Sequence, residues 1–92
     1  MNANRRPASN VVYEIIDGKL IFRGWSILNN HMTETVPEGV TFGKTGILLR
    51  LVNGEPKLDV PNGQNAELEM SDHAFRDNNE RVEGKFLEVR IY

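Results

Sequence analysis

The sequence contains no cysteine among its 92 residues. This absence excludes disulfide bridges, thiolate metal sites and cysteine nucleophiles. A secreted domain of this size usually carries disulfides, because a short chain buries too little apolar surface to be stable without additional links. We therefore expect a cytoplasmic protein.

Long hydrophobic runs are also missing. The longest apolar stretch, residues 47–52, is interrupted by Arg50 and is far shorter than the roughly 20 apolar residues that cross a bilayer as a helix. Near the N-terminus, Arg5 and Arg6 are not followed by the uninterrupted apolar core of a signal peptide. We expect a soluble protein that does not enter a membrane.

Neither sign of charge dominates the chain. It carries 11 Lys and Arg residues against 13 Asp and Glu residues, which gives a formal net charge of -2. Recognition of nucleic acid normally requires a basic patch, so no nucleic-acid partner is expected. A hydrophobic content of 39% is that of an ordinary globular protein, and the length allows one domain.

The chain does contain turn signals and β-forming segments. Residues 1–10 combine asparagines, Pro7 and Ser9 with two arginines and show no apolar periodicity, so we predict a flexible N-terminal arm there. Residues 11–92 are predicted to form a single β-rich domain.

Two dipeptides predict β-hairpins. Asp17-Gly18 and Asn53-Gly54 each separate segments rich in β-branched or aliphatic residues. Such dipeptides favour two-residue type I′ turns, in which both central residues have positive φ. Pro56 follows the second turn and cannot donate a ladder hydrogen bond, so its strand is predicted to be short or at a sheet edge.

Alternation of apolar and polar residues predicts further strands. Leu68 lies between Glu67 and Glu69, and residues 87–91 repeat the pattern. We predict a mainly β fold, as a single small antiparallel barrel or sandwich of about five or six strands. The predicted strands are 11–16, 19–25, 47–52, 57–60, 66–70 and 85–92, with a further short strand around 40–42.

One segment allows a short helix. Within residues 72–82, Arg76 and Glu80 are four positions apart and Phe75 and Val82 are seven apart, as on one helix face. The Asp and Asn residues between them are poor helix formers. We expect one short helix at most near 72–82, and an α+β fold is the alternative.

A glycine-rich segment around residues 38–51 invites comparison with a phosphate-binding loop. The spacing between Gly39 and Gly43 is one residue shorter than such a loop requires. After Lys44 and Thr45 the chain continues into an apolar strand, where a phosphate loop would begin a helix. We interpret the glycines as turn residues and expect no bound nucleotide.

The sequence shows no convincing catalytic or metal-binding pattern. His31 and His73 are the only histidines and lie far apart in the chain. Ser71 is too close to His73 along the chain to form a relay of the kind that is assembled across a fold. We predict no enzyme activity, no metal site and no cofactor.

The candidate binding residues gather around the single tryptophan and in the turn before residue 47. Aromatic rings provide stacking surfaces, while amide and guanidinium groups provide directional hydrogen bonds. A lone tryptophan is, however, also typical of a core. The candidate residues are Arg23, Trp25, Asn29, Asn30, His31, Phe42 and Lys44.

We therefore predict a small non-enzymatic protein-binding domain, such as an adaptor, an inhibitor or a phage-type accessory protein. It would act through the long connection 29–45 and a sheet face. Two alternatives stay open. One is a carbohydrate or small-ligand-binding module built around Trp25, and the other is a structural subunit or homo-oligomer held together by edge strands.

Overall fold

The computed structural model describes residues 6–27, 32–76 and 78–92. Within these ranges the chain forms eight β-strands and no helix. The strands are β1 (Ser9–Ile16), β2 (Lys19–Ile27), β3 (Thr33–Val36), β4 (Gly39–Phe42), β5 (Leu48–Val52), β6 (Glu55–Asp59), β7 (Ala66–Phe75) and β8 (Arg81–Ile91).

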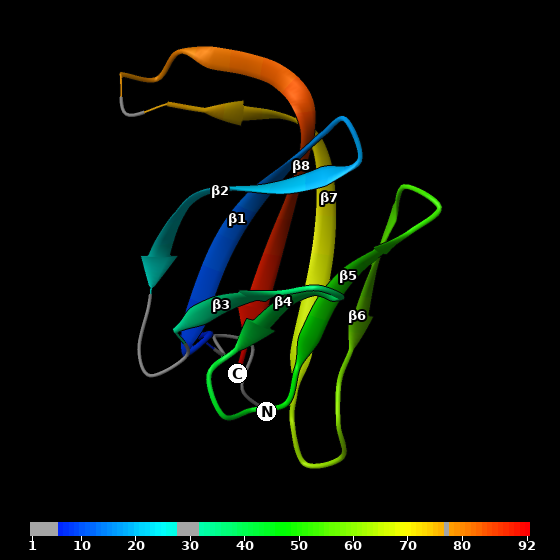
Figure 1. The fold of residues 1–92 in the computed structure, drawn as a ribbon. Helices are drawn as coiled ribbons and strands as arrows, with labels where there is room; N and C mark the ends of the chain where they lie inside the picture. The colour runs from blue at the N-terminus through cyan, green and yellow to red at the C-terminus, as the bar shows by residue number, and fades with distance from the viewer. Residues whose placement is uncertain (1–5, 28–31, 77) are drawn as a thin grey trace.

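The eight described strands form two antiparallel sheets of four strands each (Figure 1). Sheet A has the order β2-β1-β8-β7, and sheet B has the order β3-β4-β5-β6. The prediction of a mainly β fold is confirmed. The number of strands exceeds the predicted five or six, and the described strands form no closed barrel. The finer prediction, a barrel or a sandwich, is not confirmed.

Both predicted hairpin turns are present. The φ angles are 52° at Asp17 and 73° at Gly18, and 53° at Asn53 and 81° at Gly54. Positive φ at both central residues is the requirement of a type I′ turn. These turns fix the register of β1 with β2 and of β5 with β6.

The core lies between the two sheets, because alternate residues of the central strands face inward. Phe42 and Leu49 of sheet B meet side chains of β1 and β8 of sheet A in one buried cluster. Burial of each such side chain contributes about 1.5–3 kcal/mol relative to exposure. The remaining buried members are Val11, Tyr13, Val40, Ile47, Leu87, Val89 and Ile91.

Strand β1 begins at Ser9, two residues before the predicted start. Ser9 is fully buried, and the backbone N–H of Ala8 donates to the carbonyl oxygen of Ile91 at 2.6 Å. The last two residues of the predicted N-terminal arm therefore belong to sheet A. Residues 1–5 of that arm lie outside the described residues.

The predicted long connection 29–45 contains a β-hairpin. Strands β3 and β4 pair over its described part, and β4 then pairs with β5 of the same sheet. This close approach requires Gly39, because a Cβ at that position would overlap the carbonyl oxygen of Leu49. The described part of the connection, residues 32–45, is therefore largely regular structure, and the predicted short strand near 40–42 is confirmed.

The short helix predicted near residues 72–82 is wrong for the part of this segment that the structure describes. β7 extends to Phe75 and β8 begins at Arg81, with a turn between them. Arg76 and Glu80 do form an ion pair at 3.6 Å, but across this turn. The backbone N–H of Arg76 donates to the carbonyl oxygen of Glu80, so hairpin closure replaces a helical turn.

The β7–β8 hairpin bends where its register shifts. Ser71 is opposite Phe86 and His73 is opposite Glu83, so one residue of β7 faces two residues of β8 between these pairs. Such a β-bulge bends a strand pair and increases its twist. The far end of the hairpin, residues 72–76 and 78–84, curls over to the side of β2 (Figure 1). We call this segment the arm.

Candidate functional site

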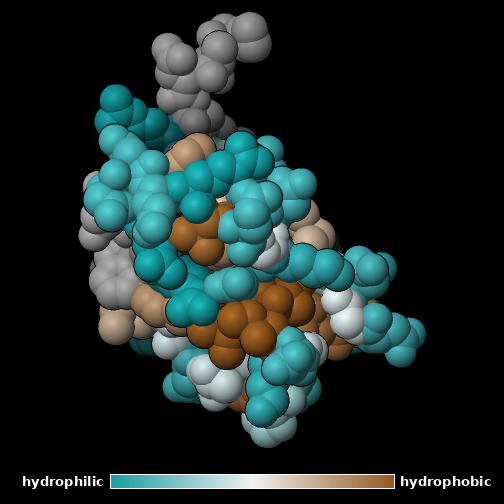
Figure 2. All heavy atoms as spheres, turned by 90° about the horizontal axis from the view of Figure 1, so that it is seen from above, coloured by the Kyte–Doolittle hydropathy of each residue, from teal (hydrophilic) through white to brown (hydrophobic). Residues whose placement is uncertain are grey.

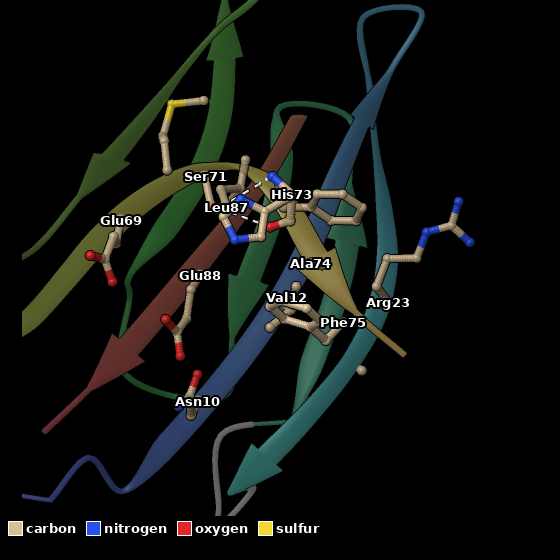
Figure 3. Close-up of a pocket in the computed structure, with 13 residues that line it drawn as sticks. Asn10, Val12, Arg23, Glu69, Ser71, His73, Ala74, Phe75, Leu87 and Glu88 are labelled. Carbon is tan, nitrogen blue, oxygen red and sulfur yellow. Dashed lines mark hydrogen bonds between the residues drawn. The ribbon is translucent and has the colours of Figure 1, made fainter. Parts of the chain in front are cut away.

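A groove lies on the outer face of sheet A, where the arm crosses it (Figure 3). It consists of two adjoining hollows of about 760 and 620 Å³. Arg23, Ala74, Phe75 and Phe86 line both hollows, which makes them parts of one depression. We call it the sheet A groove.

The wall of the groove includes apolar side chains from three strands. Val12 follows Val11, which faces the core, and therefore points to the outer face of β1. Phe86 is only 6% exposed, yet it lies outside the core cluster and lines the groove. Ala74 and Val82 are paired across the arm and line the hollow beside it. The bend of the hairpin thus creates a second, smaller apolar surface.

Phe75 stands out among the groove residues because its side chain is largely in solvent. It is 63% exposed, and its ring meets the imidazole of His73 edge to face, with 5.6 Å between the ring centroids. Phe75 and Val12 line the same hollow (Figure 3). An exposed aromatic ring beside an open groove is typical of a contact surface for another molecule.

Hydrogen bonds of Ser71 stabilise the bend at the base of the arm. Its hydroxyl donates to the carbonyl oxygen of His73 at 2.8 Å and accepts from the backbone N–H of His73 at 3.3 Å. The imidazole Nδ1 lies 3.1 Å from a carboxylate oxygen of Asp72, and this hydrogen bond lowers the pKa of the Asp72 carboxyl. The hydroxyl is engaged by the backbone, so these three residues hold a turn and show no nucleophile–base pair.

An ion pair borders the groove on the side of β2. Both Nε and Nη2 of Arg23 lie 2.8 Å from Oε1 of Glu14. Glu14 is opposite Phe86 on β8, and its carboxylate occupies the space left by the missing side chain of Gly84. The pair is partly exposed, so its contribution to stability is small. It orients Arg23 along the groove edge.

The opposite end of the groove is acidic. Arg90 of β8 forms ion pairs with Glu67 at 3.8 Å, with Glu88 at 2.9 Å and with Glu69. The hydrogen bond to Glu69, above all, raises the pKa of the Arg90 guanidinium, and the negative charges of Glu88 and Glu69 add to this effect. Three carboxylates around one guanidinium leave a formal charge of -2. We call these four residues the acidic cluster.

A polar atom without a donor lies beside the acidic cluster. Oδ1 of Asn10 is buried and accepts no hydrogen bond from the described residues. Asn10 is opposite Arg90, and Glu88 is the next outward residue of the same strand. Figure 3 shows the Asn10 amide directed toward the Glu88 carboxylate. Acceptor oxygens therefore outnumber donors at this end of the groove.

A separate hollow of about 500 Å³ opens where the two sheets diverge, between the β1–β2 and β3–β4 hairpins. Tyr13 and Phe22 line it and meet edge to face, with 5.7 Å between ring centroids. Burial raises the pKa of the Tyr13 phenol, although a hydrogen bond with Thr33 opposes this effect. Seen from above, the molecule shows a patch of apolar side chains that is bordered by hydrophilic ones (Figure 2).

Among the predicted binding residues whose side chains the structure describes, one is placed in the groove. Arg23 lines it. Trp25 belongs to β2, where its backbone is opposite Val11, and its side chain lies outside the described part of the structure. The predictions for Asn29, Asn30 and His31 also fall outside the described residues.

The prediction that Phe42 contacts a partner does not agree with its position. Its side chain is fully buried in the core between the sheets, because β4 alternates and places Phe42 on the same inner face as Val40. Lys44 is exposed in the turn after β4. The structure therefore does not bring Phe42 and Lys44 together with Arg23 into one site.

Sequence reasoning missed Val12, Phe75 and Phe86 as groove residues. A signal for two of them is present in the chain. Val12 follows Val11, and Phe86 precedes Leu87, so both strands carry apolar side chains on consecutive positions. Adjacent apolar residues in a strand indicate that both of its faces contact something.

No metal site or membrane-spanning helix is found in the described part of the chain. No group of three or more His, Cys, Asp or Glu side chains lies close enough to hold a metal ion in residues 6–27, 32–76 and 78–92. The same residues contain no helix with the length and apolar character needed to cross a membrane.

Comparison with known proteins gives no relative. No protein-family model, no curated protein and no solved structure matches the chain.

Proposed function

We propose that this protein is a small non-enzymatic protein-binding domain that engages its partner through the sheet A groove. The single observation that supports this function best is Phe75, a 63% exposed aromatic side chain beside an open, partly apolar groove. Aromatic anchors next to a concave apolar surface account for much of the affinity of protein–protein contacts.

We also propose that the two sheets act as the layers of a sandwich. The core cluster contains side chains from both sheets, so their inner faces are occupied by folding. The outer faces of the two sheets then remain for binding, and the sheet A groove lies on one of them. A cytoplasmic location accords with the absence of cysteine.

The geometry at Ser71 favours binding over catalysis. A serine nucleophile needs its hydroxyl hydrogen-bonded to a general base. The Ser71 hydroxyl instead exchanges hydrogen bonds with the backbone of His73. The groove therefore offers contact surface and charge, which are the properties of a docking site.

The test is affinity capture from native lysate with wild-type protein and two variants. Phe75→Ser removes the anchor, and Met32→Ser is the matched control, since Met32 is 65% exposed and does not line the groove. Both changes affect exposed side chains, so each should alter the free energy of unfolding by less than about 0.5 kcal/mol.

The expected result is a specific partner that Met32→Ser retains and Phe75→Ser loses. Recovery of the same partner by Phe75→Ser would show that binding takes place elsewhere. Failure of the wild-type protein to retain any specific partner would contradict the protein-binding function itself.

One observation favours a second candidate, a subunit of a larger assembly. β7 is ten residues long and stands at the edge of sheet A, so its outer backbone groups can pair with a strand of another chain. Sedimentation at micromolar protein concentrations tests this function. A monomer would count against it.

A further inference from the structure

Two carboxylates of the acidic cluster face one another across a strand pair. Glu69 of β7 is directly opposite Glu88 of β8, and both line the groove. Like charges at directly opposite positions destabilise a sheet. Arg90 contacts both carboxylates and Glu67 as well, but its single charge cannot neutralise all three.

The apolar wall begins next to this charge. Val12 is directly opposite Glu88 in the register of β1 with β8, and both side chains line the groove. Phe75 lines the same hollow from the arm. A ligand that covers the apolar wall is therefore brought to within reach of Glu88 and Glu69.

The strand register sets the spacing between these two features. Val12, Glu88 and Glu69 lie in one row across β1, β8 and β7. Because neighbouring strands are about 4.8 Å apart, the midpoint between the two carboxylate positions is about 7 Å from Val12. Positions two apart in a strand lie about 6.5–7 Å apart on one face. An extended ligand chain has the same repeat, so its side chains at positions i and i+2 match the two features.

We propose that the sheet A groove recognises an extended segment of a partner protein that carries an apolar side chain and, two positions away, a Lys or Arg. The apolar side chain packs beside Val12 and Phe75. The cation lies against Glu69 and Glu88, where it supplies the positive charge that Arg90 alone does not. This inference rests on the proposed function and names the chemistry of its partner.

The charge of the groove selects this occupant over others. An acidic segment would be repelled by the acidic cluster, whose formal charge is -2 by the ion pairs of Arg90. A free organic cation would leave the apolar wall uncovered. A basic segment with an adjacent apolar side chain satisfies both surfaces at once.

The experiment begins with selection of displayed random peptides on the full chain. The expected consensus is an apolar residue and a basic residue separated by one position. A fluorescent peptide with that consensus is then titrated by anisotropy with wild-type protein and with the double variant Glu69→Gln, Glu88→Gln. A control variant, Glu34→Gln with Glu55→Gln, changes the net charge equally on sheet B.

We expect the groove variant to weaken peptide binding about five- to tenfold at low salt, and the control to change it less than about twofold. Added salt should weaken the wild-type complex and have little effect on the groove variant. Circular dichroism of both variants verifies that each is folded.

The outcomes separate this proposal from the proposed function. Selected peptides that need Phe75 but lack a basic residue, or that bind the groove variant as tightly as wild type, overturn the proposal and leave the groove as a protein-binding site. Absence of any peptide dependent on Phe75 contradicts the function itself.

A second copy of this chain is the remaining occupant to distinguish, because the N-terminal segment contains Arg5 and Arg6. Sedimentation of the wild-type protein and of the groove variant tests this directly. Self-association that the groove variant abolishes would assign the acidic cluster to another copy and overturn the proposal. A monomer in both cases supports a partner protein.

Discussion

The two halves of the β7–β8 hairpin share their strands but differ in what supports them. In the half next to the core, Leu87 and Val89 are buried and pair in regular register with β7. Beyond the bulge, the arm has the exposed Phe75, and none of its described residues belongs to the core cluster. Continuous strands thus pass from a part that stabilises the fold to a part that is free to form a binding surface.

The comparison is sharpest when one apolar side chain is removed from each half. Leu87→Ala should lower the free energy of unfolding by about 2–5 kcal/mol, because Leu87 is 1% exposed and its removal leaves a cavity. Phe75→Ala should lower it by less than about 0.5 kcal/mol. Urea denaturation followed by circular dichroism measures the free energy of unfolding of both variants. Equal losses would contradict the difference in support between the two halves of the hairpin.

The turns of two hairpins allow the next comparison. Gly54 has a φ of 81°, so Gly54→Ala should cost about 1–2 kcal/mol, the penalty of a left-handed conformation for a residue with a Cβ. Asn79 in the arm turn also has positive φ, 62°, and Asn79→Gly should change stability by only a few tenths of a kcal/mol. Thermal melts of the two variants provide the measurement.

A smaller effect is expected at Tyr13, in the core-supporting part of β1. Tyr13→Phe removes the hydrogen bond with Thr33 and should cost about 0.5–1.5 kcal/mol at neutral pH. Burial raises the folded-state pKa above the ordinary value of 10.0. Above pH 10 the folded protein therefore keeps a proton that the unfolded chain releases. This contribution to stability is fully present below pH 10 and is lost as pH rises through the raised pKa of the folded state.

Urea midpoints at neutral and alkaline pH test this prediction. The wild-type midpoint should decline more steeply above pH 10 than that of Tyr13→Phe. Parallel declines for the two proteins would show that ionisation of Tyr13 is not coupled to folding.

The smallest expected effect is local to the arm. Ser71→Ala removes the two hydrogen bonds at the bend and should speed hydrogen exchange of the arm amides about fivefold, the equivalent of one lost hydrogen bond of about 1 kcal/mol. Amides of β8 near Val89 should exchange as in the wild type. Uniform acceleration along the hairpin would mean that the two halves open together.

The sequence predicts the regular half of the molecule well. Asp17-Gly18 and Asn53-Gly54 correctly mark two hairpins, because a type I′ turn is specified by two adjacent residues. The alternation around Leu68 and Leu87 correctly identifies inward-facing positions. Both signals are local, so they are readable without knowledge of the fold.

The groove was not predictable in the same way. The helix expected near 72–82 depended on the spacing of Arg76 and Glu80, and this ion pair forms equally well across a hairpin turn. The bulge opposite Asp72 is set by how β7 and β8 pair, which involves residues far apart in the chain. Phe42 illustrates the same limit, since only sheet packing decides that it faces the core.

The two-residue repeat of the arm also makes it a natural place for insertions. Adding one cross-strand pair beyond the bulge would lengthen the arm while leaving each existing side chain on its present face. Adding a single residue to one strand would exchange the faces beyond that point. The reach of the arm over sheet A can therefore be altered in steps, independently of the core that folds the chain.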